Sequence, residues 1–295
     1  MKKYAMTLCL LALSAVTAGA AGLQYSAPEK VEGISGYHPV LSADGAMLLY
    51  TTDDYRGLNL YDFEKSDSRV LSEAENAGFL PVFVDGGKAV MCRRAETISR
   101  LRNVAVDKIS LTDGKVENLL PLSRQEISVM YDGTATPVVK AGLHSLTARE
   151  TSTIAVRADY DHITVEQNGK STAISPVNDS HSYLWATLSP DRTRILFVEP
   201  FQGVFTCNLD GSELHRYGTG DYPVWVDNEH FVVVKSSDDG YTVTASRLYL
   251  VNAITSSAVA LTEPEMMATE AAVAPGRIVF ATEQGDIYQI SYSIK

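Results

Sequence analysis

The sequence predicts an all-β fold in which six antiparallel four-stranded sheets form a closed ring, a six-bladed β-propeller. Three observations support this prediction. Short runs of aliphatic, Tyr and Thr residues alternate with Gly, Pro, Asp and Asn, which is typical of strands and tight turns. Beyond the N-terminal apolar run, no long stretch repeats its apolar residues with the helical period. One short segment also recurs at intervals of roughly 46 residues, the length of a four-stranded repeat.

The N-terminus has the three regions of a secretory signal peptide. Lys2 and Lys3 precede an apolar run over residues 5–16, and the small residues 18–21 follow it. We therefore expect residues 1–21 to be removed on export, and residues 22–295 to form one periplasmic or secreted propeller domain. No later stretch reaches eighteen apolar residues, so we expect no transmembrane segment. A retained membrane anchor is the less favoured alternative.

Charge and cysteine content restrict the partners further. The formal net charge is −11, which argues against a nucleic-acid partner or an anionic membrane surface. Only Cys92 and Cys207 lie beyond the predicted signal peptide, and two cysteines do not form a disulfide framework for a chain of this length. Both lie in strand-like runs, so we expect them to be small buried apolar residues.

The recurring segment places a polar or bulky residue before Pro or Ala at the start of each predicted first strand. Its six copies are His38-Pro39, Leu80-Pro81, Thr136-Pro137, Trp185-Ala186, Tyr222-Pro223 and Glu270-Ala271.

Five tight turns mark the far end of the repeats, where a third strand returns as a fourth. They lie at residues 62–65, 112–115, 167–170, 209–211 and 252–255. The sixth repeat is too short for a returning strand, because only two strand-like runs, 277–281 and 286–293, follow its start. A ring must leave no open edge. We therefore predict that Leu23–Gly33, which is otherwise unassigned, completes the last blade.

Several of these segments resemble the WD40-like repeat of the TolB type. Ser42-Ala43-Asp44-Gly45 and Ser189-Pro190-Asp191 each precede an apolar strand, and 58–61 and 286–288 fit its Ile-Tyr element. The resemblance implies a propeller over nearly the whole mature chain. Residues 121–160 depart from the pattern, and we expect no counterpart of the α/β domain that precedes the propeller in TolB. The chain therefore resembles a free-standing TolB-like propeller.

No catalytic motif stands out. The six histidines form no His-x-x-x-His pair, and there is no Gly-x-Ser-x-Gly segment or phosphate-binding loop. Because some TolB-like propellers are metal-dependent lyases of pectate fragments, the resemblance leaves an enzyme as the alternative, namely a metal-dependent polysaccharide lyase or hydrolase with its site in the central channel. Convergence of His38 and His181 with a carboxylate would favour it. We predict no cofactor.

The favoured function is a non-enzymatic binding or scaffold role for a protein, peptide or glycan of the cell envelope. In a propeller, the loops that enter the first strands share one face with the loops that join the second and third strands. Tyr and Arg are favoured on recognition surfaces. An acidic pair such as Asp238-Asp239 is usually solvated, and the arginine-rich loop either contacts an anionic group or is solvated. The candidate ligand-binding residues on this face are Tyr37, His38, Asp53, Asp54, Tyr55, Arg56, Arg93, Arg94, Arg100, Arg102, Tyr183, Phe201, Tyr222, Asp238, Asp239 and Tyr241.

Overall fold

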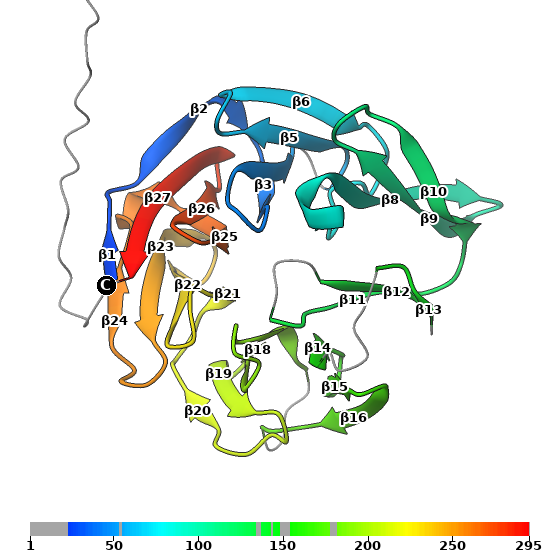
Figure 1. Ribbon diagram of the computed structural model, residues 1–295. Helices are drawn as coiled ribbons and strands as arrows, with labels where there is room; N and C mark the ends of the chain where they lie inside the picture. Colours follow the sequence, from blue (N-terminus) through cyan, green and yellow to red (C-terminus); the bar gives the residue numbers. More distant parts are fainter. Residues whose placement is uncertain are drawn as a thin grey trace, which may run out of the picture.

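The computed structural model describes residues 23–52, 55–133, 137–142, 144–147, 154–177 and 182–294. These ranges form antiparallel sheets that follow one another in chain order around a ring (Figure 1). Two single-turn 3-10 helices, η1 (Asp85–Gly87) and η2 (Pro264–Met266), are the only helices within them. No helix in the described ranges is long and apolar enough to cross a bilayer. The predicted signal peptide lies outside the described residues.

The blades are numbered in chain order. Blade 1 contains β3 (Tyr37–Leu41), β4 (Met47–Thr51), β5 (Leu58–Asp62) and β6 (Asp67–Ser72). Blade 2 contains β7 (Val82–Val84), β8 (Ala89–Ile98), β9 (Leu101–Ser110) and β10 (Val116–Ser123). Blade 3 contains β11 (Ile127–Met130), β12 (Val138–Ala141) and β13 (His144–Ser145), and blade 4 contains β14 (Ile154–Ala158), β15 (Ile163–Gln167) and β16 (Lys170–Ile174). Blade 5 contains β17 (Leu184–Leu188), β18 (Arg194–Glu199), β19 (Gly203–Asn208) and β20 (His215–Arg216). Blade 6 contains β21 (Asp221–Trp225), β22 (His230–Asp238), β23 (Val243–Asn252) and β24 (Ala258–Ala260). Blade 7 contains β25 (Ala268–Ala274), β26 (Arg277–Thr282) and β27 (Asp286–Ile294), together with β1 (Leu23–Tyr25) and β2 (Glu29–Ser35).

The two ends of the described chain meet in blade 7, as the sequence predicts. β1 pairs with β27 in the register Leu23 to Ile294, and β2 pairs with an earlier part of the same strand, with Lys30 opposite Tyr288. Val31 and Ile34 are buried in a cluster that also includes side chains of blade 1. The N-terminal strands therefore supply the partner that β27 would otherwise lack, and the predicted closure is confirmed.

The predicted number of blades is wrong, because the ring has seven sheets and not six. The difference lies between β10 and β17, where two three-stranded sheets replace the single repeat that Thr136-Pro137 was expected to begin. β12, which starts at Val138, is the middle strand of blade 3 and not a first strand. The first strand, β11, carries no Pro signal, so the sequence pattern conceals it. An isolated bridge from Tyr131 to Val156 joins blades 3 and 4.

The Ser-x-Asp element of the repeat closes the turn between the first and second strands. Ser42 Oγ donates to Asp44 Oδ1 at 2.6 Å and accepts from the Met47 N–H at 2.9 Å. Ser189 makes the same contacts in blade 5, donating to Asp191 at 2.6 Å and accepting from the Arg194 N–H at 3.0 Å. In the turn, where the pairing between the two strands stops, these side-chain hydrogen bonds hold the backbone in place. This explains why the repeat carries Ser and Asp there.

The hydrophobic core lies mostly between adjacent blades. Phe197, Phe231 and Phe280 are fully buried and belong to second strands of blades 5, 6 and 7. Cys92 and Cys207 are free and buried, as expected from their strand positions. Burial raises the pKa of each thiol to about 12, so both remain protonated at neutral pH.

Candidate ligand-binding face

One backbone feature recurs at the start of the first strands. His38, Leu80, Trp185 and Tyr222 all have positive φ, between 51° and 55°. In β3, β17 and β21 the pairing with the second strand shifts register at this point, which is a β-bulge. In β25 the shift comes one step earlier, between Ala268 and Glu270. Bulges re-aim side chains at strand ends. We call His38, Leu80, Trp185, Tyr222 and Glu270 the mouth residues, because each begins a copy of the recurring segment, in blades 1, 2, 5, 6 and 7.

Side chains of the mouth residues contact one another across blades. His38 Nδ1 lies 2.8 Å from Glu270 Oε1, and the same oxygen accepts the His38 main-chain N–H at 2.6 Å. The rings of Trp185 and Tyr222 lie 4.3 Å apart. Burial raises the pKa of the Tyr222 hydroxyl, and the nearby charge of Glu270 adds to this effect. The recurring bulges thus gather polar and aromatic groups from distant parts of the sequence into one set.

The β4–β5 loop extends this set over blades 1 and 2. Tyr55 stacks on His38 with ring centroids 3.9 Å apart and an interplanar angle of 16°. Its other neighbour is Phe79, which meets it edge-on at 5.1 Å. The Arg93 guanidinium lies 4.8 Å from the Phe79 ring centroid. A continuous row of contacts therefore runs from His38 to Arg93 on the side where the first strands begin, which we call the mouth face.

Two long hairpins border this face. The first hairpin is formed by β8 and β9, which remain paired up to Ile98. From Met91, which pairs with Val82 of the first strand, to Ile98 the hairpin is roughly 23 Å long at 3.3 Å per residue. The β22–β23 ladder continues from Val234 to Asp238, roughly 13 Å. In blade 5, by contrast, the corresponding hairpin turns directly after Glu199. Blades 7 and 1 lie between the two long hairpins in the ring (Figure 1), so His38 and Glu270 lie between them as well.

Several predicted site residues are exposed on this face. Phe201 and Tyr241 are 81% and 96% exposed, in the turns after β18 and β22. Arg100 and Arg102 are exposed at the tip of the β8–β9 hairpin, and Arg56 is exposed at the β4–β5 loop. These residues join His38, Tyr55, Arg93 and Tyr222, whose contacts are given above.

Other predicted residues have structural partners. Tyr183 is 2% exposed and packs against Phe197, so its ring belongs to the core. Tyr37 donates to the Glu283 carbonyl at 3.2 Å and connects blades 1 and 7.

The two predicted acidic pairs differ in what the structure shows of them. Asp239 accepts the N–H groups of Tyr241 and Thr242 at 2.9 and 2.8 Å, while Asp238 accepts the Gly240 N–H at 2.9 Å. The backbone hydrogen bonds lower the pKa of Asp239. This pair therefore shapes the turn. Asp53 and Asp54 lie outside the described residues.

Sequence reasoning missed Leu80, Trp185 and Glu270 as members of the face. The signal was present, since each opens a copy of the recurring segment, as do His38 and Tyr222. Glu270 was not selected because nothing in the sequence pairs it with His38, which lies 232 positions away.

The histidines of the described ranges do not converge. His38 contacts Glu270, and His230 contacts Asp227 at 3.0 Å. No group of three or more His, Cys, Asp or Glu side chains suited to a metal occurs among the residues described. His181, the proposed companion of His38, lies outside them.

Comparison with known proteins supports the fold alone. No family model matches the sequence, and no curated protein matches it. The β-propeller domain of Cps50 (Swd1) from Myceliophteria thermophila is similar in structure, with a TM-score of 0.57 and 13% identity over 89% of this chain and 98% of that domain. A putative TolB from Agrobacterium tumefaciens gives a TM-score of 0.53 and 12% identity over 93% of this chain and 99% of that one. TolB from Acinetobacter baumannii gives 0.48 and 13% over 87% of this chain, which spans 57% of that protein.

Proposed function

We propose that this protein is an exported, non-enzymatic binding propeller that recognises a protein or peptide partner through its mouth face. The main support for this proposal is the distribution of exposed apolar side chains. Of the twelve large hydrophobic residues exposed in the described ranges, seven lie at mouth positions or at the turns between second and third strands: Leu80, Ile98, Leu101, Phe201, Tyr222, Tyr241 and Val243. Exposed apolar groups gathered on one face are typical of interaction sites.

The composition of the face favours a polypeptide over a glycan. Ile98, Leu101 and Val243 are aliphatic, and they project at the tips of the two long hairpins. Burying aliphatic surface against apolar side chains of a polypeptide stabilises the complex, whereas the hydroxyls of a sugar need hydrogen-bonding partners. The aromatic residues Phe201 and Tyr241 add large contact area with little conformational freedom to lose.

Site-specific photo-crosslinking in the producing cells tests the proposal. A photoreactive amino acid at position 241 or 201 should form discrete adducts with a protein, identified by mass spectrometry. The matched controls are positions 70 and 254, where Val70 and Ile254 are also exposed but lie on an outer strand and a far-end turn. Adducts that form equally from all four positions, or from none, contradict the proposal.

Export is tested separately on the same protein. The proposal expects purified protein from the cell envelope or medium to begin near residue 21 or 22, because the predicted signal peptide ends there. N-terminal sequencing gives this result directly. An uncleaved N-terminus on protein recovered from the cytoplasm contradicts export without bearing on the mouth face.

A further inference from the structure

Arg93 occupies a repeat position that blades 1, 5, 6 and 7 fill with a small or β-branched residue. In blade 2, Val82 of the first strand pairs with Met91 of the second strand, and Arg93 lies two residues after Met91. The equivalent second-strand residues in blades 1, 5, 6 and 7 are Thr51, Val198, Val234 and Ala281. All four of these counterparts are buried. A cation at a position that otherwise serves packing breaks a local rule of the fold, and such exceptions concentrate at functional sites.

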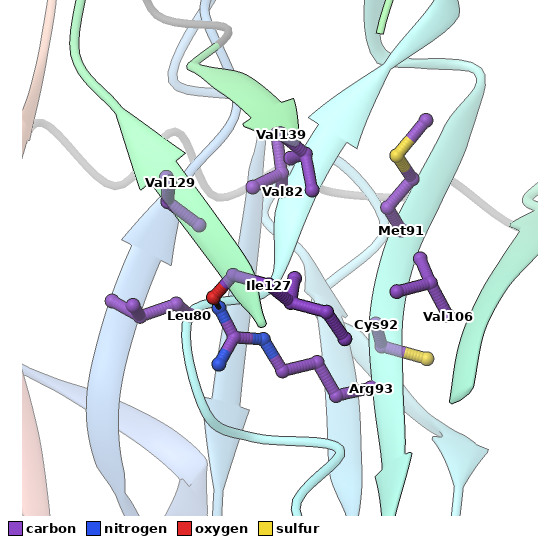
Figure 2. Close-up of a pocket in the computed structure, with 9 residues that line it drawn as sticks. All are labelled: Leu80, Val82, Met91, Cys92, Arg93, Val106, Ile127, Val129 and Val139. Carbon is purple, nitrogen blue, oxygen red and sulfur yellow. Dashed lines mark hydrogen bonds between the residues drawn. The ribbon is translucent and has the colours of Figure 1, made fainter. Parts of the chain in front are cut away.

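The surroundings of Arg93 provide few partners for its charge. The guanidinium faces the Phe79 ring, and Nη2 donates to the Ile127 carbonyl at 3.3 Å. Figure 2 shows the guanidinium beside that carbonyl and Leu80, with the valines of blades 2 and 3 around them. The cavity there is only about 10 Å³, room for a single water at most. Burial lowers the pKa of Arg93 to about 10, so it is still charged at neutral pH.

On the β8–β9 hairpin, arginines with a carboxylate partner and arginines without one among the described residues lie on opposite faces. Arg94 points to one face, where it pairs with Asp107 at 3.0 Å and with Glu96. Arg93 lies on the other face because side chains alternate along a strand. Arg102, opposite Thr97 in the ladder, shares the face of Arg93, and its charge lowers the pKa of Arg93 further. Within the described ranges, neither Arg93 nor Arg102 has a carboxylate partner.

Arg93 has donors beyond the one that Ile127 accepts. The buried side-chain nitrogen and oxygen atoms without a partner in the described ranges belong to Arg157, Thr187, Trp225 and Arg277. Arg93 is not among them, and its side chain is only partly buried. A guanidinium has five N–H donors in a planar fork, which matches a carboxylate.

We propose that Arg93 is the anchor for an acidic side chain or terminal carboxylate of a peptide segment that docks on the mouth face, beside the β8–β9 hairpin. Arg102 lies along the same face of the hairpin and attracts the same charge, while Phe79 and Leu80 contact an apolar residue of the peptide next to its acid. This inference rests on the proposed function and names the chemistry that the partner presents.

The test selects peptides from a phage-displayed random library on immobilised mature protein and measures their affinities as synthetic peptides. We expect the selected sequences to share an Asp, a Glu or a free C-terminal carboxylate. Charged hydrogen bonds in a partly desolvated site predict a loss of roughly ten- to a hundredfold in affinity for Arg93→Met. Replacing the peptide acid by its amide should cause a similar loss, and the two losses should not add because they remove the same contact. Arg93→Lys should retain part of the affinity.

The control variant is Arg69→Met on the outer strand β6, which should leave affinity unchanged. The double variant Phe201→Ser, Tyr241→Ser tests the face as a whole. If the peptides lose binding to this double variant but lack an acid, or bind Arg93→Met normally, the inference is overturned and the proposed function stands. Selected peptides that are indifferent to both sets of substitutions, or a selection that enriches nothing, overturn the two together.

Discussion

Replacing Arg93 by Met should stabilise the protein. Burial lowers the pKa of this guanidinium to about 10, and each factor of ten in proton affinity corresponds to about 1.4 kcal/mol. The penalty for holding the charge there is therefore on the order of 3 kcal/mol. The contact with Phe79 and the 3.3 Å hydrogen bond to Ile127 offset about 1 kcal/mol each. Met keeps the apolar stem, so the free energy of unfolding should rise by about 1 kcal/mol.

Urea unfolding followed by tryptophan fluorescence measures this change, and the melting temperature should rise by about 2 °C. The reciprocal variant, Val198→Arg, puts a cation at the same position of blade 5, where the residue opposite is Leu184, and should lose several kcal/mol. If Arg93→Met is instead less stable than wild type by 1 kcal/mol or more, the charge serves the fold. Arg93 would then be a structural residue, and its assignment to ligand binding would lose its energetic basis.

Three further predictions concern the fold. Deleting residues 23–35 removes four buried side chains and exposes β27, so the shortened protein should aggregate, as light scattering would show; a soluble product with native circular dichroism would refute the need for closure. Cys92 and Cys207 should not react with a thiol reagent at pH 8 until urea unfolds the chain, because the pKa of both is about 12; modification of native protein would contradict their burial. The hydrogen bond to Asp227 raises the pKa of His230. Burial raises the pKa of Asp227, but the hydrogen bonds from His230 and the main chain together outweigh it, so the pKa of Asp227 is lowered. The stability from Asp227 is therefore lost as pH falls through its lowered pKa, and that from His230 as pH rises through its raised pKa, so Asp227→Asn should lose about 1 kcal/mol at pH 6 and less at pH 9 in urea titrations.

The repeat was predictable where turn chemistry dictates the backbone. Asn168-Gly169 forms the tight hairpin between β15 and β16, because these residues tolerate the positive φ that the turn requires. The ends of the chain were predictable for a different reason, since a ring leaves no sheet edge open and the unassigned N-terminal segment has to fill it. Both signals are local or follow from simple topology.

The seventh blade was not predictable from the same signals. β11 has four residues and no Pro before it, and Thr136-Pro137 imitates the start of a repeat although β12 is a middle strand. Two three-stranded sheets therefore occupy the length in which the pattern fitted a single irregular repeat. The pattern identifies blades by their turns, and blade 3 lacks the turn sequence that marks blades 1, 2, 4, 5 and 6.

The site was predictable only in part, because its position follows from the repeat and its contacts do not. Any residue at the mouth position of a blade is placed on the mouth face by the bulge, whatever its chemistry, so the sequence could nominate His38 and Tyr222. Which of these side chains pair depends on how blades meet around the ring, as His38 and Glu270 do. Arg93 is the informative exception, since its register position favours a buried small or β-branched residue while its charge favours solvent. The fold does not require a cation there, so a requirement of binding is the simplest physical reason for its presence.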